Sequence, residues 1–367
     1  MLPALAGLPA LVLAACGGSE PPRSGPAVPG AAGPGGEARP PEAPTPAPPT
    51  PPTPPPTPTP DPRSPFTGRL VGDTSLLHRR IVAVKIDNAP LARPQLGLAY
   101  ADLVYEQLAE GNLTRFLAFF LEGEPERVGP VRSARLTDIY LGQEWEFVLA
   151  YAGAGRTTSR LLGDGLFPLL KAPELGERLD GTPYSRDGRR PVPHNLFVKV
   201  SDAREAARRE PGNAEEVEIR PFPFHEGPVE AGPLRALNLP YVPVAAVSWR
   251  YDPESGLWRR SMGGAPHVEG LNGQQIAVEN VMIQYAQIFT AQGVEPDAAG
   301  NPVLDTVLRG ENTVRLFHSG QMFEGVWSKE HDRAKTEYRL PDGNSLPFKQ
   351  GKVWVHIVPT DFAATWA

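Results

Sequence analysis

The sequence predicts an α/β domain, a sheet with packed helices, followed by a β-rich and mostly antiparallel domain. Between residues 66 and 209, short β-branched or aromatic runs alternate with helix-like segments, a pattern typical of a sheet with helices on it. After residue 243 come many short strand candidates separated by turn residues. Roughly 300 residues follow residue 65, enough for two domains of ordinary size. We therefore expect domains at residues 66–235 and 236–367.

The N-terminus carries an apolar run that ends at the single cysteine of the chain. Residues 2–15 are apolar or small and finish in Leu-Ala-Ala, directly before Cys16 and Gly-Gly-Ser. This resembles a lipobox, where the new N-terminal cysteine receives a diacylglyceryl group. A chance cysteine after an ordinary signal peptide, or a short N-terminal helix, remain alternatives, because no Lys or Arg precedes the run. We expect residues 1–16 to be a lipoprotein signal peptide, with lipidation at Cys16 and an extracytoplasmic, membrane-anchored protein.

Residues 17–65 form a proline-rich stretch. Of the 45 prolines in the chain, 20 fall in residues 21–65, mixed with Gly, Ala, Thr and Ser. Proline fixes φ and lacks the N–H that a helix or sheet ladder needs, so this stretch predicts a disordered, semi-rigid stalk. A ligand for a proline-reading domain is the alternative.

Charge and cysteine content exclude several classes of protein. The formal net charge is −6, which argues against a non-specific nucleic-acid binder. With one cysteine, the chain has no internal disulfide and no zinc finger. No His or carboxylate cluster has metal-ligand spacing, so we expect neither a metal nor a cofactor.

In the first domain the elements follow one another in short segments. The run R-I-V-A-V-K-I at 80–86 predicts a strand, because it is β-branched and stops at the turn sequence D-N-A-P. Three further strands are expected at 101–106, 113–121 and 147–152. Helices are expected at 133–145, 158–170 and 203–209, with Ser201 or Asp202 as the cap of the last.

The second domain is expected to follow a link at 210–243, which contains seven prolines. Turn residues such as D-P-E-S-G and P-D-G-N separate its strand candidates. The expected strands are 245–251, 257–260, 280–287, 313–319, 322–327, 335–340 and 353–359.

Polar residues gather at the strand ends and helix starts of the first domain, where loops of an α/β layer converge on ligands. Arginine suits forked hydrogen bonding to carboxylate or phosphate, and a helix start after Gly129-Pro130 would add N–H donors. A shared anion-binding site is one interpretation; arginines that pair with neighbouring acids to fix loops are the other. The candidate ligand-binding residues are Asp87, Asn88, Arg93, Gln95, Arg115, Arg132, Ser133, Arg135, Arg186, His194 and Asn195.

Two catalytic interpretations compete with binding. Asp87, Glu106 and Glu110 would supply the acid and base of a glycan hydrolase. Ser133, His194 and an aspartate are the residue types of a serine hydrolase, but their spacing is not diagnostic and no Gly-x-Ser-x-Gly elbow is present.

Several motifs together resemble one family. They are I-D-N-A-P-L-A-R-P-Q, A-D-L-V-Y-E, E-G-N-L-T-R-F, G-P-V-R-S-A-R and P-H-N-L-F, then V-S-W-R-Y-D, N-V-M-I-Q-Y and G-V-W-S-K. In this order, over residues 80–360, they resemble the YerB-like bacterial lipoproteins, a family of unknown function. The resemblance implies an exported two-domain lipoprotein and no particular reaction. Asn112 stands where a second glycine is usual, and residues 151–155 replace a His-x-Gly-Gly-Ser-like stretch, which argues against a serine or histidine mechanism through that loop.

The leading hypothesis is a membrane-anchored extracytoplasmic lipoprotein that binds an anionic cell-envelope ligand, such as a cell-wall polymer, or a partner protein. A hydrolase of peptidoglycan or another wall polymer, with carboxylate acid and base, is the alternative. A third hypothesis is a structural or assembly factor in which the polar motifs only fix loops.

Overall fold

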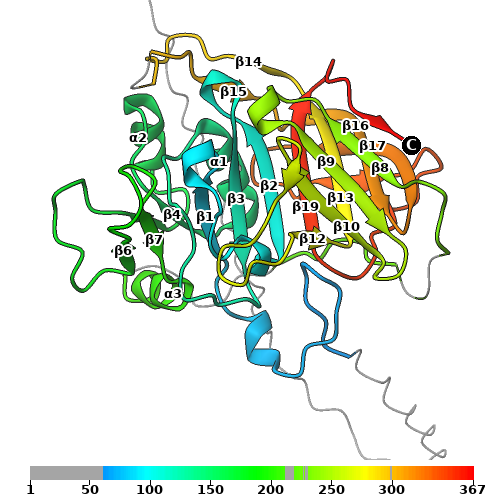
Figure 1. Cartoon of the computed structure of the whole chain (residues 1–367), viewed down its shortest axis with the longest axis horizontal. Coiled ribbons are helices and arrows are strands. Elements are labelled where there is room, and N and C mark those ends of the chain that lie inside the picture. Colours follow the sequence, from blue (N-terminus) through cyan, green and yellow to red (C-terminus); the bar gives the residue numbers. More distant parts are fainter. Residues whose placement is uncertain (1–60, 211–218, 226, 228–229, 298–299) are drawn as a thin grey trace, which may run out of the picture. The chain divides into compact units, whose positions relative to one another are not determined.

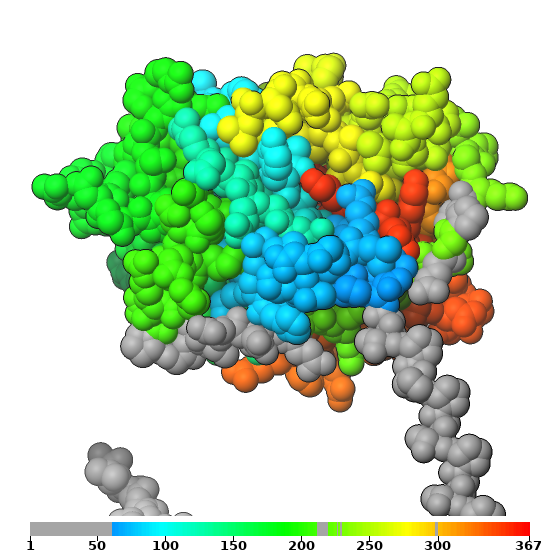
Figure 2. All heavy atoms as spheres, turned by 90° about the horizontal axis from the view of Figure 1, so that it is seen from below, coloured from blue at the N-terminus to red at the C-terminus, as the bar shows by residue number. Residues whose placement is uncertain are grey.

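The computed structural model describes residues 61–210, 219–225, 227, 230–297 and 300–367. Cys16, the expected signal peptide and almost all of the expected stalk lie outside these residues. The folded part begins a few residues before the expected boundary at 66, because Arg63 bridges to Leu70 and Ser64 is buried. Thr67 accepts a backbone hydrogen bond from Gly351, far along the chain. Figure 2 shows this first segment, in blue, lying across one face of the molecule.

Both halves of the chain contribute to one ten-stranded sheet, in the order β18-β17-β16-β13-β19-β2-β3-β1-β4-β5. The strand β19, near the end of the chain, pairs in parallel with β13 on one side and with β2 on the other (Figure 1). The strands are β1 (Val82–Asp87), β2 (Leu103–Leu108), β3 (Thr114–Phe120), β4 (Val148–Tyr151), β5 (Leu169–Lys171), β13 (Asn280–Ala286), β16 (Gly310–His318), β17 (Gln321–Lys329), β18 (Glu337–Arg339) and β19 (Val353–Pro359).

The remaining elements form smaller sheets and short helices. A second sheet runs β11-β10-β9-β8-β20, with β12 also on β10, and two hairpins pair β6 with β7 and β14 with β15. These strands are β6 (Tyr184–Arg186), β7 (Leu196–Val198), β8 (Ala236–Leu239), β9 (Val247–Asp252), β10 (Leu257–Met262), β11 (Ala265–Pro266), β12 (Ala277–Val278), β14 (Ile288–Thr290), β15 (Leu304–Thr306) and β20 (Thr365–Trp366). The helices are α1 (Leu136–Trp145), α2 (Arg156–Leu162) and α3 (Val200–Arg208), with 3₁₀ turns η1 (Thr74–Leu77), η2 (Pro90–Ala92), η3 (Leu98–Tyr100), η4 (Glu110–Asn112) and η5 (Pro243–Ala245).

The large sheet carries an apolar core on each face. Because side chains alternate along a strand, Val82 and Val84 of β1 point to one core and Ala83 points to the other. The first core also contains Val200 of α3 and Trp249 of the second sheet. The second core contains α1, through residues such as Ile139. Burial on both faces explains why β1, β3 and β13 are largely apolar and lack a polar face.

The fold class is confirmed in its coarse form. The first half contributes mixed strands, since β1 is antiparallel to β3 and parallel to β4. The strands of the second half are mostly antiparallel. Three α-helices form among the described residues, as expected, but their bounds differ: the segment 158–170 is helical only to Leu162, and residues 169–171 form β5. Helix α3 begins at Val200, with Lys199 at the capping position, so neither Ser201 nor Asp202 is the cap.

A buried histidine predicts part of the pH dependence of stability. The Nε2 atom of His318 lies 2.7 Å from the Pro347 carbonyl oxygen, and the ring stacks on Phe323. Burial lowers the pKa of His318 to about 4. The stability that the neutral ring contributes is therefore present above pH ~6.5 and is lost as the pH falls towards 4, at most about 3 kcal/mol. In urea titrations, H318Q should lose less unfolding free energy than the wild type between pH 7 and 4; parallel curves would contradict this.

Candidate functional site

Asp87, the last residue of β1, is the hub of a buried polar cluster. Its Oδ2 atom forms an ion pair with Arg132 Nε at 2.9 Å and contacts His194 Nδ1 at 2.7 Å. Its Oδ1 atom contacts Arg115 Nη1 at 3.2 Å and accepts from the Ala89 amide at 3.0 Å. Burial raises the pKa of Asp87, but the charges of Arg115 and Arg132 outweigh burial and hold it below its usual value. Asp87 is therefore an ionised, fully paired carboxylate.

A chain of hydrogen bonds leads from Asp87 into the protein. Gln95 Nε2 donates to the Asp87 carbonyl at 2.9 Å and to Asn88 Oδ1 at 3.2 Å. Asn88 Nδ2 donates to Thr114 Oγ1 at 2.6 Å, and that hydroxyl donates to Glu106 Oε1 at 2.9 Å. All five residues are buried. The expected site residues Asn88 and Gln95 thus hold the loop after β1 in place and face no solvent.

Glu106 forms a buried ion pair with Arg260 from the second half of the chain. Arg260 Nη2 lies 3.0 and 2.9 Å from the two carboxylate oxygens, and both side chains are wholly inaccessible to solvent. Trp354 Nε1 donates to Glu106 Oε2 at 3.0 Å, and His356 Nδ1 lies 3.3 Å from the same atom. Burial raises the pKa of Glu106, but Arg260 and His356 more than offset it and keep the pKa low. His267 continues the chain of contacts: its Nδ1 contacts Arg260 Nη1, and its Nε2 lies 2.8 Å from Gln95 Oε1.

Arg115, Arg132 and Arg135 line one cavity of about 350 Å³. Its opposite wall comes from residues 294–297 and 303, so the cavity is assembled from both halves of the chain. Its volume lies in the range of small-ligand pockets. Of the other sequence-predicted residues, Glu110 and Ser133 also line it, whereas Asp87 lies behind the arginines.

Arg132 has unused donors in this cavity. Its Nε atom forms an ion pair with Asp87, which holds the side chain in place, while about a quarter of the side chain stays exposed. Within the part of the chain that the structure describes, its two terminal nitrogens make no hydrogen bond or ion pair. Arg115 is 8% exposed, and its buried Nε has no partner. Arg132 therefore offers free N–H donors to a ligand, whereas the unpaired Nε of Arg115 is buried beneath the cavity wall.

Arg135 does not fit the predicted binding role. Its Nε donates to Glu110 Oε2 at 2.7 Å, and its Nη1 donates to the carbonyls of Ser133 and Ala134. The start of α1 is also occupied, because the Arg135 amide donates to Asp138 Oδ2 at 2.7 Å. The amide of the capping residue is therefore already engaged, by an acid that the sequence supplies at the third helical position.

The other candidate residues lie outside this cavity. Arg186 Nη1 donates to Asn195 Oδ1 at 3.1 Å across the β6–β7 hairpin. Arg93 lines a separate, mostly apolar cavity with His267. Arg93, Arg186 and Asn195 therefore do not line the cavity at Arg132.

No complete catalytic set is assembled from the described residues. His194 contacts Asp87 through Nδ1, but the Ser133 hydroxyl donates to the Ala152 carbonyl at 3.0 Å. Glu106 is sealed inside, and Glu110 is paired with Arg135. A general acid requires a raised pKa, whereas the pKa values of Asp87 and Glu106 are held low. No group of three metal-ligating side chains occurs in the same described part.

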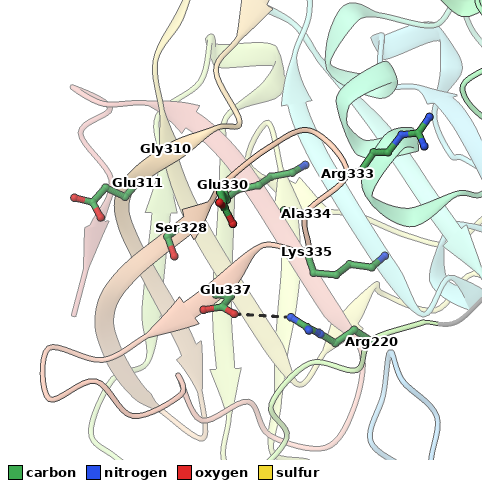
Figure 3. A pocket seen from close by; sticks show the side chains of 10 residues that line it. Arg220, Gly310, Glu311, Ser328, Glu330, Arg333, Ala334, Lys335 and Glu337 are labelled. Carbon is green, nitrogen blue, oxygen red and sulfur yellow. Dashed lines mark ion pairs between the residues drawn. The ribbon is translucent and has the colours of Figure 1, made fainter. Parts of the chain in front are cut away.

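A second polar groove, of about 800 Å³, lies along β16, β17 and the loop to β18 (Figure 3). Its cations are mostly neutralised internally. Lys329 Nζ contacts Glu144 Oε2 at 2.9 Å. Arg220 lies 3.8 Å from Glu337, an ion pair that is dashed in Figure 3. Lys335 stacks over the Trp145 ring. Because acids match these bases, this groove favours an anion less than the cavity at Arg132 does.

Comparison with known proteins agrees with this architecture. Two family profiles match, "Protein of unknown function (DUF3048) N-terminal domain" over residues 66–213 and the corresponding C-terminal domain over residues 237–355. The chain belongs to this YerB-like DUF3048 family. It is 31% identical over 314 residues to "Putative lipoprotein YerB" of Bacillus subtilis, covering 83% of this chain and 88% of that protein.

A crystal structure of the Bacillus subtilis YerB protein has the same fold. It superposes with a TM-score of 0.71 at 30% identity, and the match covers 83% of this chain and 99% of the other. In this YerB-like chain no helix among the described residues is long and apolar enough to cross a membrane.

Sequence reasoning missed the partners that the second half contributes to the cluster. Arg260 was not singled out, although it sits at an inward position of β10, between Trp258 and Met262. A charged residue at an inward position of an alternating strand is the signal that points to a buried ion pair. Trp354 and His356 carry no comparable signal, because β19 is buried on both faces.

Proposed function

We propose that this protein is an extracytoplasmic lipoprotein, anchored through Cys16, that binds an anionic group of a cell-envelope ligand in the cavity at Arg132. The proposal rests on Arg132, whose side chain is held in place but whose terminal nitrogens are unpaired among the described residues. Asp87 fixes its Nε, its terminal nitrogens have no partner among the described residues, and it lines a cavity of ligand size. A guanidinium held in this way is preorganised for forked hydrogen bonding to a carboxylate or phosphate.

Charge supports an anion over a cation at this wall. Arg115, Arg132 and Arg135 are opposed there by two acids, Asp87 and Glu110, so one positive charge is left over. Across the cavity, the Glu295 carboxylate accepts hydrogen bonds from the Thr157 amide at 2.7 Å and from the Thr157 hydroxyl at 2.8 Å. Asp297 is engaged by Asn301. These partners are neutral, so both carboxylates stay charged, and charge favours an anion at the arginine wall rather than across the whole cavity.

A hydrolase of a wall polymer is the second candidate, and one contact favours it. The 2.7 Å contact between Asp87 and His194 would orient a general base. Against it stand the buried, low-pKa carboxylates and the absence of a nucleophile hydrogen-bonded to His194 in the described part. Binding without turnover fits these observations better.

The test uses the full chain with two probes, insoluble peptidoglycan and a poly(glycerol phosphate) immobilised on beads. Pelleting reports binding, and mass spectrometry of the supernatant reports cleavage. Retention that weakens as salt rises, with no released fragments, is the expected result, because a partly exposed arginine–anion contact is screened by ions. Released fragments would show that the protein hydrolyses the polymer and does not merely bind it. If neither probe retained the protein, anionic envelope polymers would be excluded as its ligands.

Lipid anchoring makes a separate prediction at the N-terminus. In a bacterial host, the wild type should incorporate radiolabelled palmitate and partition into detergent, because a thioether-linked lipid and an N-acyl chain hold it in the membrane. The variant C16S should lose the label and the detergent partitioning, whereas S19A should behave as the wild type. A labelled C16S protein would contradict lipidation at this residue.

A further inference from the structure

The mostly apolar cavity at Arg93 has a volume of about 620 Å³ and lies between the loop after β1 and the hairpin of β10 and β11. Its walls are mainly apolar: four prolines, at positions 90, 94, 243 and 266, with Val244, Met262 and Val268. Val244 is about half exposed, so this apolar surface is open to solvent. The two ionisable side chains that line it are Arg93 and His267.

His267 supplies no charge to this cavity. It is 4% exposed, and both ring nitrogens are used, Nε2 by Gln95 Oε1 and Nδ1 by Arg260. Burial, together with the neighbouring charge of Arg260, holds the pKa of His267 well below its usual value. The ring is therefore neutral at physiological pH, and Arg93 is the cation of the cavity.

Arg93 lacks the acid partner that the other buried arginines have. Arg115 pairs with Asp87 and Arg260 pairs with Glu106, but no ion pair joins Arg93 to any acid in the described ranges. Its Nη2 donates to the Asn88 carbonyl at 2.9 Å, and its buried Nε has no partner. A half-buried cation without a counterion is costly, so a bound anion would stabilise it.

The loop that carries Arg93 is held in place before any ligand binds. Arg190 donates to the carbonyls on both sides of Arg93, those of Ala92 at 3.2 Å and of Pro94 at 2.9 Å. The Gly270 amide donates to the Gln95 carbonyl at 2.7 Å, which ties the same loop to the second half of the chain. A ligand therefore meets a preformed cation, and little ordering is required on binding.

We propose that this cavity binds an amphiphilic carboxylate, with its acid group on Arg93 and its hydrocarbon chain against the proline, valine and methionine walls. One cation among apolar walls matches one anionic head on an apolar chain. A peptide fits less well. Proline has no N–H, and the amides of Gly263 and His267 are already bonded to the carbonyls of Ala246 and Arg260. A peptide backbone there would leave its own carbonyl groups unsatisfied.

The probe is decanoate, added below its micellar concentration to the full chain and followed by isothermal titration calorimetry. Saturable binding of one decanoate per chain is expected, with decan-1-ol binding more weakly. The variant R93Q keeps a donor for the Asn88 carbonyl but removes the charge, and should weaken decanoate binding roughly tenfold to a hundredfold. R93K, which keeps the charge, should lose less.

A second variant tests the apolar wall without touching the loop that carries Arg93. V244D places a carboxylate on the exposed wall and should also weaken decanoate binding. L175D, at an exposed leucine that does not line the cavity, should bind as the wild type. Equal thermal midpoints show that the variants are folded. Absence of saturable decanoate binding would overturn the proposal. Wild-type affinity for decanoate in both R93Q and V244D would overturn it as well. Preferential binding of an apolar peptide with a free C-terminal carboxylate would overturn the choice of a lipid-like ligand.

Discussion

Replacing Glu106 with alanine should lower the free energy of unfolding by about 3–5 kcal/mol, the range for breaking a buried ion pair. The variant leaves the Arg260 guanidinium inside the protein without its counterion, and Trp354 Nε1 and Thr114 Oγ1 lose their acceptor. It also removes a side-chain link between the two halves of the chain, next to the backbone pairing of β2 with β19. Urea unfolding, followed by fluorescence and circular dichroism together, measures the change.

Two further variants make this prediction specific. Glu126 is exposed and pairs with Lys199 at 3.3 Å, so E126A should change stability by about 0.5 kcal/mol or less. In the double variant E106L/R260M both charges are gone, and much of the loss should be recovered because no buried charge is left unpaired. A fully stable E106A protein would show that the cluster around Glu106 does not hold the halves together.

Replacing Arg132 with alanine should reduce the affinity for the envelope anion roughly tenfold to a hundredfold, because one charge-assisted hydrogen bond contributes about 1.5–3 kcal/mol. The fold should survive, since Asp87 keeps Arg115, His194 and the Ala89 amide as partners. Retention on peptidoglycan or poly(glycerol phosphate) beads, measured across a salt series, gives the affinity and its salt dependence.

The matched controls separate the geometry of Arg132 from its charge. R132K keeps the charge but loses the forked donors, and should lie between the wild type and R132A. R178A removes the same charge from an exposed arginine paired with Asp180, and should bind as the wild type. If R178A and R132A weakened retention equally, general charge rather than the cavity would be responsible.

The sequence predicted the cluster at Asp87 because polar residues stood at strand ends and before a helix start. That rule placed Asp87, Arg115 and Arg132 correctly beside one another. It also included Asn88, Gln95 and Glu106, which are buried and bonded inside the protein. Strand-end position indicates where loops meet, but it does not tell whether a polar side chain turns to solvent or into the core.

The features that sequence could not supply are contacts between distant segments. Glu106 finds Arg260, and Arg132 faces a cavity whose other wall is residues 294–297. Both contacts depend on β19, which inserts between β2 and β13 and joins the halves in one sheet. A continuous apolar run such as 353–358 predicts a buried strand but not its neighbours. Likewise, the helix expected at 158–170 stops at Leu162, and residues 169–171 pair with β4.

Arginine footprinting shows whether Arg132 contacts the bound anion. The full chain is treated with butanedione, with and without soluble poly(glycerol phosphate) or peptidoglycan fragments, and mass spectrometry gives the modification of each arginine. With the ligand that is retained, Arg132 should be protected while exposed Arg178 is modified to the same extent as before. Retention of the ligand with unchanged modification of Arg132 would contradict the account.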